Sequence, residues 1–487
     1  MTLTSTTFNS DFKQLQVAII GGGLGGLSAA VALRRAGHLV NIYERRDFKV
    51  EVGASISCAA NGTRWLREWA VDTTPGKPIN LMKLVMRDWE TGQILNQYSL
   101  ENYAEEWGDY CYMFYRQDMH AMLLKAATSP EGDGTPAKVV VDHICESVDY
   151  ENGTVSFKNG IMVKADLIIG ADGIRASPFF IFQSFEAERA EFSQLFGARS
   201  VLYLTRNLHL KLAIVAMFVG KISINSDWSS IPMILQCSQF WGGIQGSGPD
   251  GRSEFYKIVM TPCSGGDIVS FYCFMPTELT RHHEEGFVFE EVPVSDILAG
   301  RYSELDSDCV SLLKNSIDRM PWRLYTHKPY SHWYKGKTCV LGDAAHPMVP
   351  HQSQGACQAI EDAAALGIIF SGKYKYTQDI TAGLELYEAI RKPRATRVQS
   401  ASARAMENLN ERIGFTSLAP HDATLAAAEG KLTVNEMNTY NMHDHIAALA
   451  GVMHENKMET LVDKAVCVER MNSVGLNQDS LSYAAKL

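Results

Sequence analysis

Short apolar runs, each followed by glycine or acidic residues, recur along this chain. Residues 16–20 form a compact run rich in β-branched side chains, which is typical of a strand buried on both faces of a parallel sheet. Residues 27–37 carry small and apolar side chains and predict a helix that stops at Gly37. Residues 38–43 predict a second strand, which ends at Glu44. This order of strand, helix and strand indicates the α/β class.

Two later apolar runs repeat the pattern of a strand followed by an acidic turn. Residues 165–170 lead to Asp172, and residues 338–341 lead to Asp343. A solvated turn is one interpretation of Asp172, but the buried run before it favours a position that faces a site. The most apolar run, residues 212–219, is too short to span a bilayer, so we expect a buried strand or helix there.

A glycine-rich loop between the first strand and the first helix predicts a dinucleotide site rather than a turn without a ligand. Gly21 allows a tight turn, Gly23 lets the backbone approach a pyrophosphate, and Gly26 permits close contact between helix and strand. The start of the helix offers unpaired N–H groups and a partial positive charge to the phosphates. Glu44 lies where an acidic side chain accepts hydrogen bonds from an adenosine ribose and repels a 2′-phosphate. The sequence therefore favours FAD or NAD over NADP in this loop.

Length and composition narrow the class of protein further. A chain of 487 residues with 46% hydrophobic and 21% charged residues is typical of a globular protein with two closely integrated domains. The net charge of −10 argues against nucleic acid as a partner, because phosphate binding needs clustered Lys and Arg. Ten cysteines form no CxxC pair, and the first residues are polar, so we expect no secretory signal. We therefore expect a cytoplasmic protein without a membrane span.

Two histidine-containing groups could be drawn as metal ligands. They lie at residues 282–285 (His-His-Glu-Glu) and 443–445 (His-Asp-His). No complete ligand set recurs at a suitable spacing, so a solvated loop is the better interpretation of each group. We expect no metal.

Three segments far apart in the chain together resemble one family. They are Gly21–Gly26 (Gly-Gly-Gly-Leu-Gly-Gly), Gly170–Gly173 (Gly-Ala-Asp-Gly) and Gly342–Pro347 (Gly-Asp-Ala-Ala-His-Pro). Each segment is weak evidence alone, but their order and spacing resemble those of FAD-dependent aromatic hydroxylases (group A flavoprotein monooxygenases), particularly the salicylate-hydroxylase-like branch. We expect these distant loops to converge on one elongated cavity that holds FAD.

The resemblance implies further FAD-binding positions beyond the glycine loop. Asp343 is expected to bind a ribityl hydroxyl, and Gly355 and Ala356 to open a helix whose amides face the pyrimidine edge of the isoalloxazine ring. A helix start at that edge stabilises the negative charge of reduced flavin. The other implied contacts are Gly53 beside the ring, Arg116 at the ribityl or phosphate chain, and Asp172 near the flavin and its pyrophosphate.

The resemblance also implies the reaction. NADH or NADPH reduces the bound FAD, reduced flavin and O2 form a C4a-hydroperoxide, and one oxygen atom passes to a phenolic or indolic ring. The implied catalytic positions are His346 and Pro347, with Pro347 packed beside the reactive edge of the flavin. His346, His351 and tyrosines of the segment that departs from the family pattern are candidates for the group that favours a phenolate substrate. The expected partners are a small aromatic molecule and O2, and the oligomeric state is left open.

The sequence departs from the family pattern between residues 178 and 240. A strand that would carry a catalytic or substrate-orienting arginine cannot be placed in this segment. Two alternatives to a hydroxylase therefore stay open. One is a flavin oxidase or dehydrogenase that transfers no oxygen, and the other is a catalytically impaired FAD-binding protein.

The family's architecture implies three regions. A Rossmann-type FAD/NAD(P)-binding three-layer domain is assigned to residues 1–73, 103–177 and 320–400. An inserted mixed β-sheet domain that binds the substrate takes residues 78–102 and 178–319. A C-terminal helical region covers residues 401–487.

Overall fold

The architecture is taken from a computed structural model, which describes ten stretches of the chain. The described stretches are residues 12–48, 54–173, 210–211, 215–223, 236–247, 253–276, 293–298, 300–324, 326–407 and 432–453. The chain divides after Tyr440 into two compact units. The second unit is helical at residues 442–453. All elements named below belong to the first unit.

A six-stranded sheet contains every strand that the sequence predicts around the glycine loop. Its strands, in spatial order, are β20 (Tyr334–Lys335), β21 (Thr338–Val340), β12 (Leu167–Gly170), β1 (Gln16–Ile20), β2 (Leu39–Tyr43) and β8 (Lys138–Val140). All neighbours are parallel except β20 and β21, which are antiparallel. Ile20 pairs with both Gly170 and Tyr43, so β1, β2 and β12 end at the same edge of the sheet. The loops that follow these strands therefore meet at that edge.

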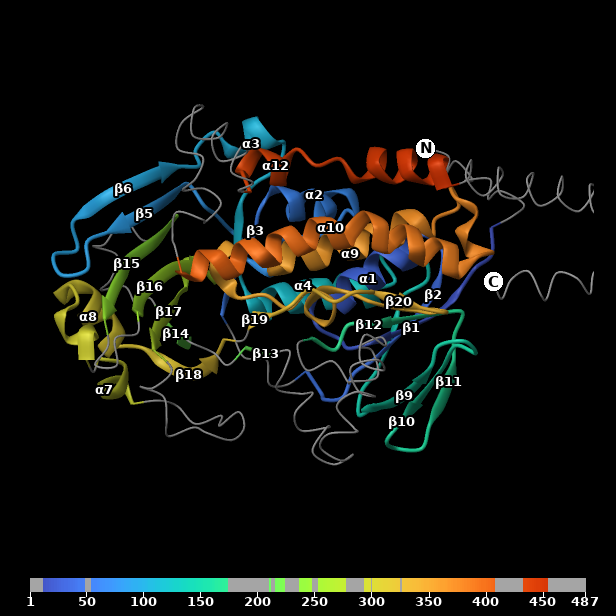
Figure 1. Cartoon of the computed structure of the whole chain (residues 1–487), viewed down its shortest axis with the longest axis horizontal. Helices are drawn as coiled ribbons and strands as arrows, with labels where there is room; N and C mark the ends of the chain where they lie inside the picture. The colour runs from blue at the N-terminus through green and yellow to red at the C-terminus, as the bar shows by residue number, and fades with distance from the viewer. Residues whose placement is uncertain are drawn as a thin grey trace, which may run out of the picture. The chain divides into compact units, whose positions relative to one another are not determined.

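The helix that follows the glycine loop belongs to a group of helices that pack on one another. They are α1 (Leu24–Arg35), α2 (Ala60–Glu68), α4 (Arg116–Thr128), α9 (Gly355–Ile369) and α10 (Ile380–Glu407). Helix α1 packs on α4 and α9, and α10 runs alongside α9 (Figure 1). The approach of α1 to α9 is close, since a Cβ atom at Gly367 would lie 2.9 Å from the Cβ atom of Ala32. Gly37 follows α1 with φ +97°, which confirms it as the predicted stop.

A seven-stranded mixed sheet forms the second large layer. Its strands, in spatial order, are β18 (Ile317–Arg323), β14 (Val215–Ser223), β17 (Ile268–Pro276), β16 (Ser253–Cys263), β15 (Cys237–Ser247), β5 (Lys83–Arg87) and β6 (Ile94–Ser99). Only β15 and β5 are parallel. One face of the sheet packs against α7 (Val294–Ile297) and α8 (Ser307–Lys314) in a buried apolar cluster. The apolar run at residues 212–219 contributes the start of β14; residues 212–214 lie outside the described residues.

Smaller elements complete the first unit. Two of them are three-stranded sheets: β3 (Ser55–Cys58), β7 (Tyr112–Tyr115) and β4 (Ile79–Asn80) form one, and β11 (Met162–Lys164), β10 (Thr154–Phe157) and β9 (Cys145–Asp149) form the other. The rest are the strand pair β13 (Leu210–Lys211) and β19 (Thr326–His327) and the short helices α3 (Tyr103–Trp107) and α12 (Val434–Asn438).

The expected α/β fold class is confirmed, whereas the boundaries of the three regions stay a prediction. No helix within the described stretches is both long and apolar enough to cross a membrane.

Candidate active site

The glycine loop has the tight packing that its place in the motif requires. Gly21 has φ +111°, and a Cβ atom there would lie 2.4 Å from the carbonyl oxygen of Ala171. A Cβ atom at Gly26 would lie 2.1 Å from the carbonyl oxygen of Gly21. Gly23, which precedes α1, is different, because a Cβ atom there would meet nothing within 4 Å. The loop is therefore closed towards the sheet and open at Gly23, where a ligand can approach the backbone.

Two side chains from other elements hold the glycine loop through Gly22. Glu44, which follows β2, accepts a hydrogen bond from the Gly22 N–H through Oε2 at 2.7 Å. His120 of α4 is buried, and its Nε2 lies 2.7 Å from the Gly22 carbonyl oxygen. The sequence assigned Glu44 to an adenosine ribose, and that role stays a prediction: both Glu44 carboxylate oxygens accept backbone N–H groups, and Glu44 is not part of the cavity wall. His120 was not singled out. Both contacts fix the loop that leads into the N-terminus of α1.

Arg116 and Asp343 face a common cavity from two different elements. Arg116 begins α4, and Asp343 lies in the turn after β21. Asp343 is accessible within the cavity. Desolvation by the surrounding protein nevertheless raises the pKa of its carboxyl, and the charges of His346 and Arg116 act in the opposite direction. Burial lowers the pKa of the Arg116 guanidinium, and the Asp343 charge acts in the opposite direction. A guanidinium and a carboxylate thus line the same cavity, as a donor and an acceptor for a polar ligand.

The first residues of α9 form another part of the same wall. Gly355 and Ala356 both line the cavity, and Gln354 precedes them at the N-cap. The N-terminus of this 15-residue helix brings unpaired N–H groups and a partial positive charge to the cavity. This placement suits a ligand that carries negative charge.

A single cavity of about 450 Å³ joins these groups. It extends from Gly23 in the glycine loop, past Arg116 and Asp343, to side chains of the seven-stranded sheet. Since Glu44 bonds directly to the glycine loop, Glu44 and Asp343 belong to one side of the molecule and not to opposite sides. Loops from distant parts of the chain therefore line one cavity, as expected, and Glu44 contacts it only through the glycine loop.

The middle segment of the family pattern also reaches the cavity. Ala171 and Gly173 line it, while Asp172 between them is half-buried and is not part of the wall. Gly53 lies outside the described residues. No group of three or more His, Cys, Asp or Glu side chains that could hold a metal ion occurs in the described stretches; residues 282–285 lie outside them.

The two positions assigned to catalysis lie behind the cavity wall. His346 is fully buried, and its Nε2 is 2.6 Å from Oδ2 of Asp362 in α9. The same Asp362 oxygen accepts the Gly342 N–H at 2.9 Å. Pro347 is buried as well, and its carbonyl oxygen accepts a hydrogen bond from Nε2 of Gln399 at 2.9 Å. His346 and Pro347 therefore connect the turn after β21 to α9 and α10 and do not line the cavity.

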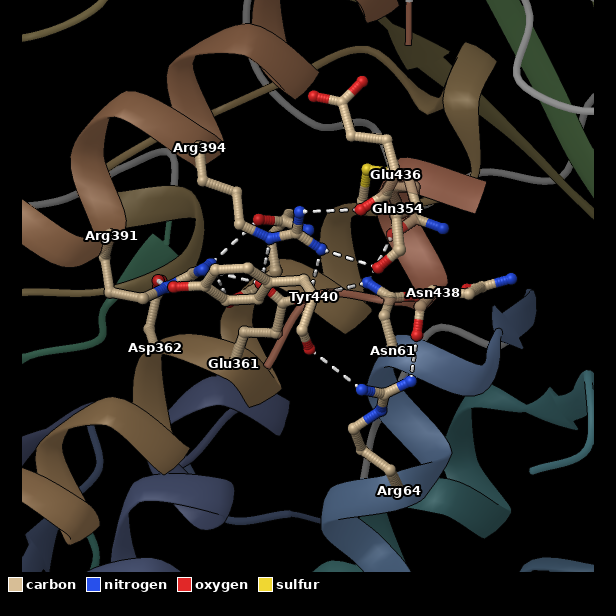
Figure 2. Close-up of polar contacts among 12 residues, drawn as sticks. Asn61, Arg64, Gln354, Glu361, Asp362, Arg391, Arg394, Glu436, Asn438 and Tyr440 are labelled. Carbon is tan, nitrogen blue, oxygen red and sulfur yellow. Dashed lines mark hydrogen bonds and ion pairs between the residues drawn. The ribbon is translucent and has the colours of Figure 1, made fainter. Parts of the chain in front are cut away.

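A buried ionic network that no sequence motif predicted continues behind α9 (Figure 2). Arg391 of α10 is fully buried, and it donates to Oδ1 of Asp362 at 2.8 Å and to Oε2 of Glu361 at 2.6 Å. Arg394 also donates to Glu361, with both distances below 3 Å. Burial by itself raises the pKa of Glu361, but Arg394 and Arg391 outweigh it and the pKa is lowered. The pKa of Asp362 is lowered in the same way, by His346 and Arg391 acting against burial.

The network also holds the segment that contains α12. Arg394 donates to the Met437 carbonyl oxygen at 2.9 Å, and Arg64 of α2 donates to the Tyr440 and Asn438 carbonyl oxygens (Figure 2). Val434, Met437 and Asn438 line the cavity. Helix α12 lies in the helical region expected at residues 401–487, but no local signal connects it to a site on distant helices. The arginines therefore fix a wall of the cavity that comes from late in the chain.

Two family descriptions match parts of the chain. Residues 19–67 match an NAD(P)-binding Rossmann-like domain, and residues 259–402 match an FAD binding domain. These ranges contain the glycine loop, the turn with Asp343 and the start of α9. The described groups fit FAD, because Gly23 leaves open space, helix N-termini face the cavity, and Arg116 and Asp343 offer polar contacts.

Relatives extend the match over most of the chain. Hispidin-3-hydroxylase from Neonothopanus nambi is 30% identical over 392 residues, which cover 80% of this chain and 88% of that protein. An FAD-dependent monooxygenase from Aspergillus candidus is 28% identical over 80% of this chain and 84% of its own length. A salicylate hydroxylase substrate complex has the same fold, with a TM-score of 0.62 and 20% identity over 89% of this chain and 97% of that chain. The protein is thus an enzyme that belongs to the family of FAD-dependent monooxygenases and hydroxylases.

Proposed function

We propose that this protein uses NADH or NADPH and O2 to hydroxylate a small phenolic or indolic molecule. The observation that carries the proposal is the single cavity that joins the glycine loop to the seven-stranded sheet. One part of that cavity is polar and suits a dinucleotide. The other part is walled largely by apolar and aromatic side chains and suits an aromatic ring.

Bound FAD would supply the redox and oxygen-transfer chemistry, and the protein would bind and orient the reactants. The open backbone at Gly23 and the start of α1 would face the pyrophosphate. Arg116 and Asp343 would hold the ribityl or phosphate chain, and the start of α9 would stabilise negative charge on the flavin ring. These roles rest on the positions of the groups along the cavity.

The apolar part of the cavity would exclude water from the reacting groups. Its walls include Leu84, Phe240 and Phe274 from strands of the seven-stranded sheet, and Leu81 and Leu100 from the turns that follow β4 and β6. Exclusion of water protects a reactive oxygen donor and strengthens the electrostatic interactions inside the cavity. We assign His346 and Pro347 positioning roles, because both hold the turn with Asp343 and neither lines the cavity.

Purified full-length protein tests the proposal directly. A yellow protein should oxidise NADH or NADPH and consume O2 faster when a suitable phenol or indole is present. Mass spectrometry of the product should then show the addition of one oxygen atom. A screen of phenols and indoles also identifies the substrate and the preferred nicotinamide.

Two other outcomes identify the alternatives. A yellow protein that converts all consumed O2 into hydrogen peroxide, with no hydroxylated product, is an oxidase. A colourless protein that binds no added FAD is a catalytically impaired relative. The pairing of β14 with both β17 and β18 supports a built sheet wall in the described part of the divergent segment, residues 178–240.

A further inference from the structure

Gln354 brings a side-chain amide to the cavity wall at the start of α9. The residue lines the cavity and is only 6% exposed. It occupies the N-cap position of the helix, yet its side chain makes no capping hydrogen bond. The first N–H groups of α9 are therefore left to other partners. A buried amide also needs partners of its own, so the orientation of this side chain matters.

Asn61 of α2 contacts Gln354 from behind α9 (Figure 2). Its Nδ2 donates to Oε1 of Gln354 at 3.0 Å and to Oε1 of Glu361 at 2.8 Å, and all three side chains are buried. Burial alone would raise the pKa of Glu361, but Arg394 and Arg391 lower it. Glu361 is therefore a carboxylate, which can only accept hydrogen bonds. Asn61 must turn its NH2 group, and not its oxygen, towards Glu361.

The orientation of Asn61 in turn fixes that of Gln354. The second N–H of the Asn61 amide is directed at Gln354, so Gln354 must face it with Oε1. The Gln354 nitrogen, Nε2, is left for other partners, and no described residue accepts a hydrogen bond from it. Oδ1 of Asn61 also has no partner in the described part of the chain, so it does not compete for this orientation. A buried carboxylate thus decides that Gln354 offers a donor.

Two kinds of donor therefore meet at one place in the cavity. The first backbone N–H groups of α9 and the side-chain N–H groups of Gln354 belong to the same stretch of wall. The proposed function places the flavin ring at this stretch. A donor stabilises an acceptor atom more strongly when that atom carries negative charge, and reduced flavin carries negative charge. Donors at this stretch thus favour reduced over oxidised flavin.

We propose that Gln354 donates its side-chain N–H to the ring of bound FAD and raises its reduction potential, and that Asn61 positions Gln354 for this contact. This role rests on the proposed function for the position of the flavin ring. It requires neither an aromatic substrate nor the transfer of oxygen. Gln354 is then a residue in contact with the cofactor, and Asn61 is a positioning residue that acts through it.

The midpoint potential of the FAD-loaded full-length protein tests the contact without turnover. It is measured by stepwise reduction without oxygen, against dyes of known potential. Gln354→Leu removes the donor and should reduce the preference for reduced over oxidised FAD about tenfold, the size expected of one hydrogen bond to a charged group. For a two-electron couple, this loss lowers the potential by about 30 mV. Gln354→Glu puts a negative charge in place of the donor and should lower the potential further.

Variants of α2 test the positioning role. Asn61→Leu should lower the potential, because Gln354 loses the contact that orients its amide. The double variant Asn61→Leu/Gln354→Leu should have the potential of Gln354→Leu, since Asn61 acts only through Gln354. Thr63→Val is the control and should keep the wild-type potential. It removes a buried hydroxyl from the same helix, which bonds to the Ala59 and Tyr110 carbonyl oxygens and not to Gln354.

Far-ultraviolet circular dichroism and the FAD content verify the folding of each variant. Gln354→Met provides a second side chain without a donor if the leucine variant does not fold. An unchanged potential in the folded variant without the donor overturns the contact with the flavin. An equal fall in Thr63→Val also overturns it, because the fall then reflects a general loss of packing.

The remaining outcomes separate the two roles from each other and from the proposed function. An unchanged potential in Asn61→Leu, or additive falls in the double variant, overturns only the positioning role of Asn61. If the potential depends on Gln354 but no aromatic compound is hydroxylated, hydroxylation fails while the contact stands. If hydroxylation occurs and no variant changes the potential, only the contact fails. A full-length protein that binds no FAD overturns both.

Discussion

His346 and Asp362 are joined by a 2.6 Å contact between Nε2 and Oδ2 in a fully buried part of the structure. The lowered pKa of Asp362 keeps its carboxyl ionised, so the imidazole N–H donates to it. Asp362 also accepts hydrogen bonds from Arg391 and from the backbone of Gly342. One carboxylate therefore ties the turn with Asp343 to helices α9 and α10.

Loss of this carboxylate should strongly destabilise the fold. In Asp362→Asn, Arg391 loses a charged partner in a buried environment, which costs about 3–5 kcal/mol in the free energy of unfolding. Chemical unfolding followed by circular dichroism measures the change. Glu101→Gln is the control, because its ion pair with Lys83 is solvent-exposed and worth at most about 1 kcal/mol. Equal losses in the two variants would contradict a structural role for the buried network.

Two glycines of the same loop should respond differently to one added methyl group. Gly21→Ala should destabilise the fold by more than about 1 kcal/mol, because φ is +111° and the new Cβ would meet the carbonyl oxygen of Ala171. Gly23→Ala should change the free energy of unfolding by less than about 1 kcal/mol, since nothing lies within 4 Å of its Cβ position. Its FAD dissociation constant should instead rise about tenfold, measured by fluorescence titration of the apoprotein. If Gly23→Ala binds FAD normally, the pyrophosphate does not lie at this loop.

Arg394 and Arg397 of α10 form a matched pair for testing the wall formed by α12. Arg394 bonds to Glu361 and to the Met437 carbonyl, so Arg394→Met should raise KM for the aromatic substrate more than it lowers kcat, and should cost about 2–3 kcal/mol of stability. Arg397→Met removes a half-exposed ion pair with Glu436 and should cost less than about 1 kcal/mol. Steady-state kinetics and chemical unfolding check both variants. An unchanged KM in Arg394→Met would show that the α12 wall does not depend on this arginine.

His38 should make the protein less stable as the pH falls below neutrality. Its Nδ1 accepts the Leu15 N–H, its Nε2 lies 2.8 Å from the Phe370 carbonyl oxygen, and burial lowers its pKa to about 4. The unfolded chain binds a proton at the ordinary pKa of about 6.5, so stability is lost as the pH falls from about 6.5 to about 4. At pH 5 the loss is about 2 kcal/mol relative to pH 7. Chemical unfolding at the two pH values should show this difference in wild type and not in His38→Asn; parallel behaviour of the two proteins would contradict it.

Local sequence carried enough information for the nucleotide-binding part of the fold. The strand at 16–20, the helix after it and the strand that ends before Glu44 each follow from a few neighbouring residues, and the structure contains all three. Gly355 was correctly placed at the start of a helix. The family and the need for FAD followed from three such local segments taken together.

The remaining features depend on contacts between distant residues. Arg391 and Glu361 are typical of an exposed helical surface by residue type, and only the packing of α10 on α9 buries them. Lys257 faces the cavity because β16 lies between β15 and β17, a pairing that no short segment specifies. The family resemblance implied catalytic positions at His346 and Pro347, but tertiary contacts place both behind the wall.

Side chains along the central strands of the seven-stranded sheet alternate between its two faces, so substitutions on the two faces have different effects. Substitutions on one face of the sheet alter the core packed under α7 and α8, and most of them reduce stability. Substitutions on the other face alter residues that line the cavity, among them Ser238, Phe240, Lys257, Val259, Tyr272 and Phe274. Val259, Tyr272 and Phe274 also pack with Val349 and Met406, so changes at these three affect stability as well as the cavity. The proposed function places changes of substrate range at the six cavity positions. A focused mutant library for changing the enzyme's substrate should begin with them.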